Sequence, residues 1–190
     1  SSKYKKFTHL EHILARPDTY IGSLVPDTSK QWVVSALNES NTKEKHVMLE
    51  KQITHIGGLF KIFDEVLVNA IDHSTTEEHK VDKIQVCVNK EHGYIKVTNT
   101  GQGIPVELHQ SHENKWIPEL IFGELLTSSN YDDTQERVTG GRNGYGAKLA
   151  NVFSSEFELE TACTVNKKKY VQTWTANMTK KSAPKITKYS

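Results

Sequence analysis

The sequence predicts a protein of the α+β class, because hairpins of short strands alternate with helices along the chain. The longest helical pattern covers 56–73. Apolar and polar side chains alternate over 83–89, and a second strand pattern returns over 94–98 after a glycine-containing turn, which predicts an antiparallel hairpin. A second hairpin is predicted from 157–165 and 170–177. Antiparallel strands that follow one another in sequence, with separate helices, are typical of this class.

The composition fits one globular domain. The chain has 190 residues, of which 36% are hydrophobic and 25% charged, and its net charge is +1. This balance does not indicate a nucleic-acid or membrane-surface partner, and no apolar run approaches the ~20 residues that a membrane-spanning helix needs. The two cysteines lie in separate predicted strands without a CxxC motif, so we expect free thiols in a reducing compartment.

Three weaker elements precede the long helix. Thr8 and Glu11 have the spacing of a capping box, which predicts a helix of one or two turns after Thr8. Two short extended segments are predicted at 31–34 and 46–49. The polar connector between them, 38–45, is predicted to form the tip of a hairpin.

The remaining local signals are boundaries and short helices. Pro17 is expected to end the first helix, because the residue before a proline is disfavoured in the helical conformation. Helical patterns appear at 117–126 and, after a cluster of glycines, at 147–153. The residues after Lys180 show no pattern, so no element is predicted there.

The long helix carries one polar seam. Its apolar side chains point in nearly every direction, which predicts a buried helix. Glu65, Asn69 and Asp72 are spaced i, i+4 and i+7, and at about 100° per residue they fall within a wedge of roughly 60°. A buried polar seam is costly unless its groups face a ligand, a partner or water. The alternative is a hydrogen-bonded seam that serves only packing.

Two glycine-containing loops suggest a ligand. Gly141, Gly144 and Gly146 directly precede a predicted helix, where backbone N–H groups and the helix dipole favour a phosphate. Their spacing is neither a dinucleotide fingerprint nor a Walker A loop, and a tight turn is the alternative. The loop 99–105 follows a strand and combines a polar side chain with a bare glycine backbone. This combination suits the recognition of a flat heterocycle. The alternative is an ordinary turn at the end of a strand.

With these pieces in order, the chain resembles the ATPase domain of the GHKL superfamily. The E-x-x-x-N-x-x-D helix, the [DN]-x-G-x-G-I-P loop and the G-x-x-G-x-G lid match the pattern of gyrase, ninety-kilodalton heat-shock chaperones, histidine kinases and MutL. The flanking segments look like the eukaryotic kind of type IIA DNA topoisomerase. These segments are 10–14, 16–22, 61–65, 122–133 and 140–149.

The resemblance implies a fold and a set of site residues. The fold is the two-layer Bergerat sandwich, a mixed β-sheet with helices on one face, preceded by an N-terminal arm over 1–22, with the ATP-binding domain over 23–190. Glu65 matches the general base that activates water, and Asn69 matches the ligand of Mg²⁺. The other matched ATP-binding residues are Asp72, Asn99, Ser128, Ser129, Asn130, Gly141, Arg142, Asn143, Gly144, Tyr145, Gly146, Ala147 and Lys148.

The resemblance also implies partners and a location. ATP and Mg²⁺ are the expected cofactors, and ATP closes two such domains into a homodimer gate through which one DNA duplex passes another. DNA is contacted and cut by domains outside this chain, the nucleus is the expected location, and no membrane is involved. A downstream transducer domain supplies a lysine to the γ-phosphate, so the 190-residue chain is expected to bind ATP but to hydrolyse it poorly. Without the transducer domain, the chain is also expected to be a monomer.

Two alternatives share the same nucleotide chemistry. One is a chaperone-type or mismatch-repair ATPase, against which the segments 16–22 and 128–131 argue. The other is a nucleotide-sensing dimerisation module without hydrolysis, against which Glu65 argues. His9 and His12 are interpreted as surface residues rather than metal ligands, because no further ligands accompany them. The run 167–169 is interpreted as a solvated hairpin tip rather than a DNA contact.

Overall fold

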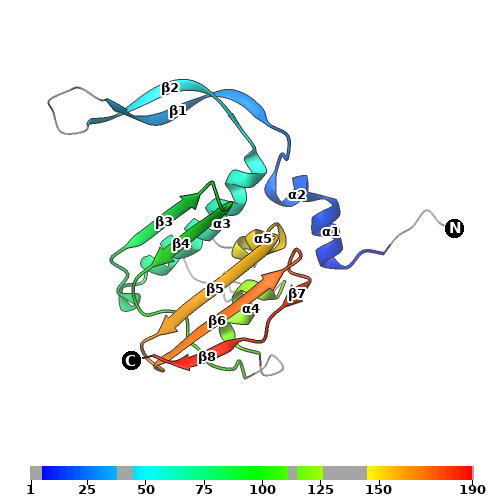
Figure 1. Ribbon diagram of the computed structural model, residues 1–190, viewed down its shortest axis with the longest axis vertical. Helices are drawn as coiled ribbons and strands as arrows, with labels where there is room; N and C mark the ends of the chain where they lie inside the picture. Colours follow the sequence, from blue (N-terminus) through cyan, green and yellow to red (C-terminus); the bar gives the residue numbers. More distant parts are fainter. Residues whose placement is uncertain (1–5, 38–44, 111–114, 126–144, 190) are drawn as a thin grey trace, which may run out of the picture.

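The computed structural model describes residues 6–37, 45–110, 115–125 and 145–189 (Figure 1). Within these ranges, five α-helices and one 3₁₀ turn accompany eight strands. In chain order the elements are α1 (His9–Ala15), α2 (Pro17–Ile21), β1 (Asp27–Leu37), β2 (Lys45–His55), α3 (Gly57–Ser74), the 3₁₀ turn η1 (Glu77–His79), β3 (Ile84–Asn89), β4 (Tyr94–Asn99), α4 (Ile117–Gly123), α5 (Gly146–Val152), β5 (Glu156–Cys163), β6 (Lys168–Thr175), β7 (Lys180–Lys181) and β8 (Lys185–Lys188).

The strands form antiparallel pairs, as the sequence predicted for the three hairpins. β1 pairs with β2, β3 pairs with β4, and β6 lies between β5 and the two short strands β7 and β8. The α+β class is therefore confirmed. The expected single mixed sheet differs from the structure, because the described strand pairs are all antiparallel and form three separate sheets.

The β3–β4 hairpin meets the third sheet through a loop instead of a strand ladder. The backbone N–H of Ile104 donates to Oγ1 of Thr161 in β5 at 3.0 Å. A Cβ added to Gly103 would lie 2.1 Å from the carbonyl oxygen of Ala162, also in β5. The bare backbone of this loop therefore lies directly against β5, which brings the two sheets together without a continuous ladder.

Helices cover one face of the strands, as expected for a two-layer sandwich. In Figure 1, α3, α4 and α5 lie behind β3 to β6. One apolar cluster lies between the third sheet and α4 and consists of Val106, Leu159, Cys163, Tyr170 and Trp174. A second cluster joins α1, α2 and α5 and consists of Ile13, Ile21, Leu149 and Val152.

The long helix α3 is less buried than its sequence predicted. Only Gly58 and Ala70 are buried in it, whereas the side chains of Leu59 and Phe60 are 56% and 63% exposed. The helix contacts α2, α5 and β4, which together cover only part of its circumference. Although apolar residues occur on every side of α3, its neighbours within this chain do not bury the helix.

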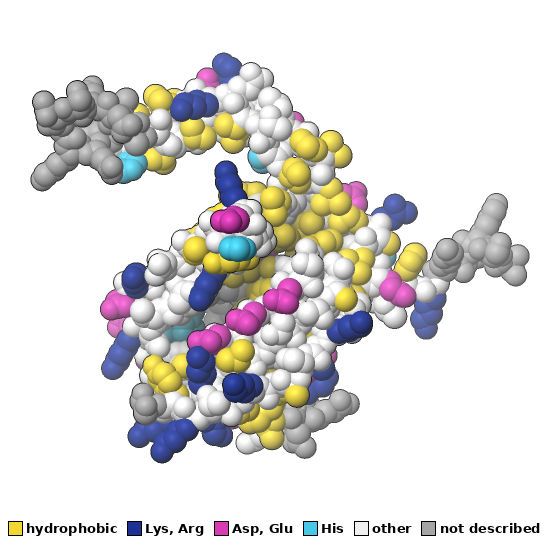
Figure 2. All heavy atoms as spheres, in the orientation of Figure 1, with side chains coloured by type: hydrophobic (Ala, Val, Ile, Leu, Met, Phe, Trp, Pro, Cys, Tyr) yellow, Lys and Arg dark blue, Asp and Glu magenta, His cyan; other side chains and the backbone are white. Residues whose placement is uncertain are grey.

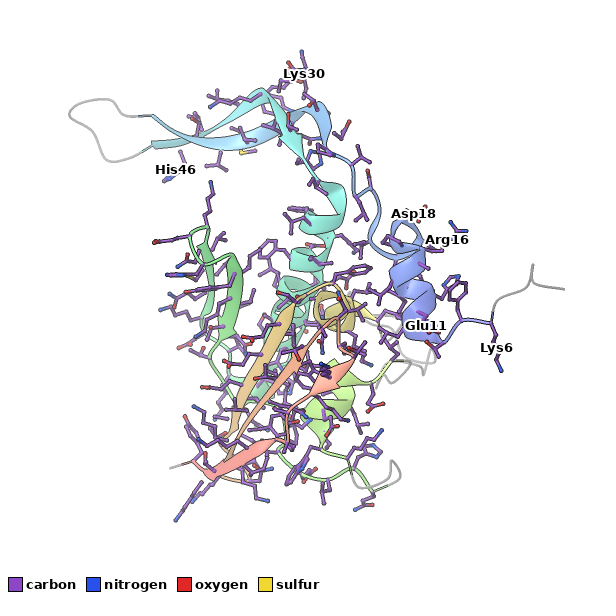
Figure 3. All side chains as sticks on the ribbon, turned by 45° about the vertical axis from the view of Figure 1, so that its right-hand side comes forward. Lys6, Glu11, Arg16, Asp18, Lys30 and His46 are labelled. Atoms are coloured by element: carbon purple, nitrogen blue, oxygen red, sulfur yellow. The ribbon has the colours of Figure 1, made fainter. Side chains whose placement is uncertain are left out.

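The β1–β2 hairpin extends well beyond the predicted short strands. It projects from the body of the molecule, with Lys30 and His46 marking its two strands (Figure 3). Trp32 and Val34 are 66% and 63% exposed, and hydrophobic side chains are visible along the hairpin in Figure 2. The middle of the predicted tip, 38–44, lies outside the described residues.

The two ends of the described chain show one confirmed and one wrong prediction. The capping box is present, since the N–H of Thr8 donates to the Glu11 carboxylate at 2.7 Å and the N–H of Glu11 donates to the Thr8 hydroxyl at 3.2 Å. Helix α1 ends before Pro17, which itself begins α2. The absence of elements after Lys180 is wrong, because β7 and β8 pair with β6 there. These lysine-rich edge strands are too short to show an alternating pattern.

The predicted boundary between an arm over 1–22 and a domain over 23–190 stays a prediction. Within the described residues, α1 and α2 share an apolar cluster with α5 and form part of the same body. None of the helices described here combines the length and the hydropathy that a membrane crossing requires.

We predict that Gly103→Ala destabilises the chain by about 3 kcal/mol, because the new methyl group would overlap the backbone of β5. The measurement is urea unfolding of the nucleotide-free protein. Gly57→Ala is the matched control, since the nearest atom to its added Cβ is 4.0 Å away, and its free energy of unfolding should change by less than about 0.5 kcal/mol. Equal stabilities of the two variants would contradict the contact between this loop and β5.

Candidate functional site

The polar seam of α3 is held by two short interactions within the helix. Lys61 Nζ lies 2.6 Å from Glu65 Oε1, an i, i+4 ion pair that leaves the Glu65 side chain 18% exposed. The hydrogen bond to Glu65 raises the pKa of Lys61. Asn69 Nδ2 donates to the backbone carbonyl of Glu65 at 2.6 Å. These contacts fix one carboxylate oxygen of Glu65 and the amide nitrogen of Asn69.

The start of α5 lies directly against this seam. A Cβ added to Gly146 would be 3.0 Å from Glu65 Oε2 and 3.3 Å from Asn69 Nδ2. Any residue larger than glycine would have to displace one of the two groups. The structure therefore brings together three residues that lie up to 81 positions apart in the sequence and that were all predicted to belong to the site.

The remaining oxygens of the seam fit a magnesium ion. Asn69 Oδ1 accepts no hydrogen bond within the described residues, because the amide uses its nitrogen for the helix. Oxygen ligands suit Mg²⁺, which takes few protein ligands and keeps water and phosphate oxygens. In the described part of the chain, no three His, Cys, Asp or Glu side chains gather as a metal cage.

The glycine loop 99–105 is held by hydrogen bonds at Asn99 and Thr100 and by close packing at Gly101. Asn99 ends β4 and donates from Nδ2 to the carbonyl of Thr100 at 2.9 Å. The Thr100 hydroxyl contacts the carboxylate of Asp82 and accepts from the backbone N–H of Lys83 at 3.1 Å. Gly101 has a φ of +101°, and an added Cβ would lie 2.4 Å from the carbonyl oxygen of His79.

Two stacked imidazoles connect this loop to the end of α3. The rings of His73 and His79 are 3.9 Å apart at 14°, and His79 Nδ1 lies 2.9 Å from the His73 carbonyl oxygen. The His79 carbonyl accepts from the N–H of Gln102 at 2.7 Å. Burial and the neighbouring His79 lower the pKa of His73. These contacts fix α3, which carries Glu65, relative to the loop that begins at Asn99.

Lys148 is a buried cation in the first turn of α5. Its side chain is almost fully buried, and burial lowers its pKa to about 8, although the Glu124 carboxylate acts in the opposite direction. Glu124 also forms an ion pair with Lys115 at 2.9 Å. Ala147, beside Lys148, is buried as well. Lys148 therefore places a buried positive charge in the first turn of α5, within the electrostatic influence of Glu124.

The other predicted site residues lie partly within the described ranges. Asp72 lies on α3, where its backbone carbonyl accepts from the Thr75 hydroxyl at 2.8 Å. Tyr145 directly precedes α5, and its hydroxyl contacts His9. The residues outside the described ranges are Ser128, Ser129, Asn130, Gly141, Arg142, Asn143 and Gly144.

Three contacts at the site were missed by sequence reasoning. Lys61 could have been found from its i, i+4 spacing to Glu65. His79 had no local signal, because its role depends on the fold. His9 was interpreted as a surface residue, yet it contacts Tyr145, which is 136 residues away.

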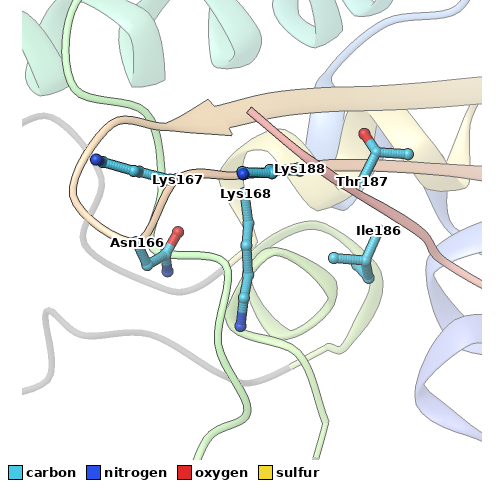
Figure 4. Close-up of a pocket in the computed structure, with 6 residues that line it drawn as sticks. All are labelled: Asn166, Lys167, Lys168, Ile186, Thr187 and Lys188. Atoms are coloured by element: carbon cyan, nitrogen blue, oxygen red, sulfur yellow. The ribbon is translucent and has the colours of Figure 1, made fainter. Parts of the chain in front are cut away.

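A cavity elsewhere on the surface does not belong to this site. It has a volume of about 390 Å³ and is lined by Asn166, Lys167, Lys168, Ile186, Thr187 and Lys188 (Figure 4). These residues come from the β5–β6 turn and the adjoining ends of β6 and β8, and none is a predicted site residue. Lys169 pairs with Glu160 across β5 and β6 at 2.8 Å.

Comparisons with known proteins give one consistent result. Residues 54–183 match the family described as histidine kinase-, DNA gyrase B-, and HSP90-like ATPase. The chain is 54% identical over 187 residues to DNA topoisomerase 2 of Penicillium chrysogenum, and this match covers 98% of this chain but 11% of that protein. The chain thus spans about one ninth of that relative.

Solved structures agree with the sequence comparison. The ATPase region of Saccharomyces cerevisiae topoisomerase II matches 98% of this chain, and 47% of its own chain, at 52% identity and a TM-score of 0.89. The ATPase and transducer domains of DNA topoisomerase II from Balamuthia mandrillaris match 100% of this chain, and 46% of their own, at 43% identity and a TM-score of 0.90. The similarity therefore includes both the sequence and the fold.

We predict that the buried Lys148 makes stability depend on alkaline pH. Its pKa is about 8 in the folded chain, against 10.5 for a lysine in an unfolded chain, so the unfolded chain binds more protons and folding gains stability as pH rises through this interval. Relative to Lys148→Met, the wild type should gain about 2 kcal/mol of unfolding free energy between pH 7.5 and pH 10. Urea unfolding of both proteins at several pH values measures this, and parallel curves would contradict a depressed pKa.

Proposed function

The chain belongs to the histidine kinase-, DNA gyrase B- and HSP90-like ATPase family, and on that premise we propose that it is the ATP-binding domain of a type II DNA topoisomerase. In this proposal, bound ATP closes a dimer gate so that one DNA duplex passes through another. The support is the similarity of the whole chain to DNA topoisomerase 2 and to the ATPase region of the yeast enzyme.

The observation that carries the nucleotide site is the approach of Gly146 to Glu65 and Asn69. At this contact the two helices meet without an intervening side chain. The bare backbone of Gly146 lets the start of α5 approach the carboxylate and the amide, so that a phosphate bound at this turn would lie next to both groups. A side chain at this position would have to displace one of these groups.

Glu65 is the proposed general base. Oε1 is engaged by Lys61, so Oε2, which faces Gly146, is the oxygen available to take a proton from an attacking water. The ion pair holds the carboxylate in place. The same arrangement favours hydrolysis over a pure nucleotide sensor, which needs no base at this position.

Asn69 is the proposed protein ligand of magnesium, through the Oδ1 that its helix does not use. When bound, the ion would neutralise charge on the phosphate oxygens. Lys148, buried in the first turn of α5, is proposed to pair with the triphosphate. Asn99, at the end of β4, is proposed to read adenine, with its loop fixed by Thr100 and His79. The remaining predicted ATP contacts, at 128–130 and 141–144, stay part of the proposal.

The activity of the complete protein is proposed from its relatives. We infer a homodimer that acts on duplex DNA in the nucleus, with DNA bound by regions beyond the ATP-binding domain. The exposed apolar side chains of the β1–β2 hairpin and of α3 support a further protein contact, since a patch of this kind is commonly covered in an assembly. A chaperone-type or mismatch-repair ATPase is disfavoured by the identity to DNA topoisomerase 2 along the whole chain.

We predict that the chain binds a non-hydrolysable ATP analogue in a magnesium-dependent manner. Asn69→Ala should weaken binding about tenfold with Mg²⁺ present, a loss of about 1.4 kcal/mol, and much less in its absence. The proposed metal contact is lost only when magnesium is present, whereas the loss of the hydrogen bond to the Glu65 carbonyl affects both conditions alike. Titration calorimetry with and without Mg²⁺ measures both affinities.

Asn166→Ala is the matched control for this experiment, because it removes the same amide from the distant β5–β6 turn. It should bind like the wild type. Equal effects of Asn69→Ala with and without magnesium would assign the metal to another residue. No binding of the analogue by the wild type would contradict the proposed nucleotide site.

A further inference from the structure

Four aromatic rings join the N-terminal helices to the start of α5. His9 and His12 come from α1, Tyr20 comes from α2, and Tyr145 directly precedes α5. The ring centroids of His9 and Tyr145 are 5.2 Å apart, and those of Tyr20 and Tyr145 are 5.9 Å apart. His12 packs edge-on against Tyr20 at 5.8 Å. We call these four residues the ring cluster.

One hydrogen bond in the ring cluster connects distant parts of the chain. The Tyr145 hydroxyl lies 2.5 Å from His9 Nε2. The second bond, between His12 Nδ1 and the Tyr20 hydroxyl at 2.8 Å, links only neighbouring helices. His9 is thus the polar contact through which the ring cluster holds Tyr145.

The start of α5 has little local support of its own. Tyr145 is the N-cap residue, and its side chain makes no capping hydrogen bond to the helix. The helix has seven residues, and isolated helices of this length are unstable in water. Its position therefore depends on tertiary contacts, among them the apolar cluster that includes Leu149 and Val152 and the bond from Tyr145 to His9.

Gly146 directly follows Tyr145, and little space separates it from α3. The space between its Cα and the groups of Glu65 and Asn69 does not admit a methyl group unless one of them moves. A displacement of the Tyr145 side chain would be transmitted through one peptide unit to this contact. The apolar cluster fixes the later turn of α5, whereas His9 fixes its first residue.

We propose that His9 is a positioning residue for the nucleotide site: through Tyr145 it holds the first turn of α5 so that Gly146 stays against Glu65 and Asn69. The consequence for nucleotide affinity rests on the proposed function, whereas the positioning itself does not. The N-terminal helices thereby act on the site without touching it.

The test compares three variants of the 190-residue chain. His9→Phe keeps an aromatic ring beside Tyr145 but removes the hydrogen-bonding nitrogen, and His9→Gln restores a nitrogen of similar reach. His92→Phe is the control, because it makes the same change at an exposed histidine in the β3–β4 turn. Two quantities are measured: amide hydrogen exchange over 149–152 in the nucleotide-free protein, where the N–H of Leu149 donates to the Tyr145 carbonyl, and the affinity for a non-hydrolysable ATP analogue.

We expect His9→Phe to speed exchange over 149–152 about fivefold, as for the loss of one hydrogen bond, and to weaken nucleotide binding by a similar factor. The midpoint of thermal unfolding should change little, because the apolar cluster remains. His9→Gln should restore both quantities, and His92→Phe should alter neither.

Unchanged exchange in His9→Phe, or a failure of His9→Gln to restore it, would overturn the positioning role. Faster exchange with unchanged nucleotide affinity would overturn the link from His9 to the site. If the wild type binds no nucleotide, the proposed function fails, and the exchange measurement still decides whether His9 positions the start of α5.

Discussion

The close approach of α5 to α3 at Gly146 is the constraint on which the rest of the site depends. Because no side chain separates the two helices there, a carboxylate, an amide and a bare backbone meet at one point. Helix α3 supplies the first two groups at i, i+4 spacing, and the apolar cluster with α1 and α2 brings α5 to them. The second glycine loop is attached to the same helix through the stacked rings of His73 and His79. The site is therefore assembled from segments that are far apart in the chain.

The two lysines discussed for this site, Lys61 in α3 and Lys148 in α5, have different roles. Lys61 is half-exposed and neutralises one oxygen of Glu65, so the acidic group is held without being buried alone. Lys148 is buried, and this burial lowers its pKa, because removing a cation from water disfavours its charged form. A buried cation close to a bare glycine backbone is a reasonable arrangement for a protein that binds a triphosphate, because the ligand would offset that effect.

Much of this arrangement could be predicted from the sequence, and the exceptions have physical reasons. The capping box at Thr8, the β3–β4 hairpin and the helix that carries the polar seam follow from local spacing, and the structure confirms them. The burial predicted for α3 was wrong because helical periodicity does not show how many neighbours cover a helix. The strand pairing of β7 and β8 depends on β6, and the contact of His9 with Tyr145 depends on the packing of α1 against α5. Such tertiary contacts leave no local pattern.

The most direct test of the proposed nucleotide site is a crystal structure of the chain with a non-hydrolysable ATP analogue and Mg²⁺. We expect the terminal phosphate to lie beside Gly146 and Asn69 Oδ1 to coordinate the magnesium ion at about 2.0–2.1 Å. Glu65 Oε2 should face a water next to the phosphate. A nucleotide bound away from the contact between α3 and α5, or a magnesium ion whose ligands exclude Asn69, would contradict the proposed site.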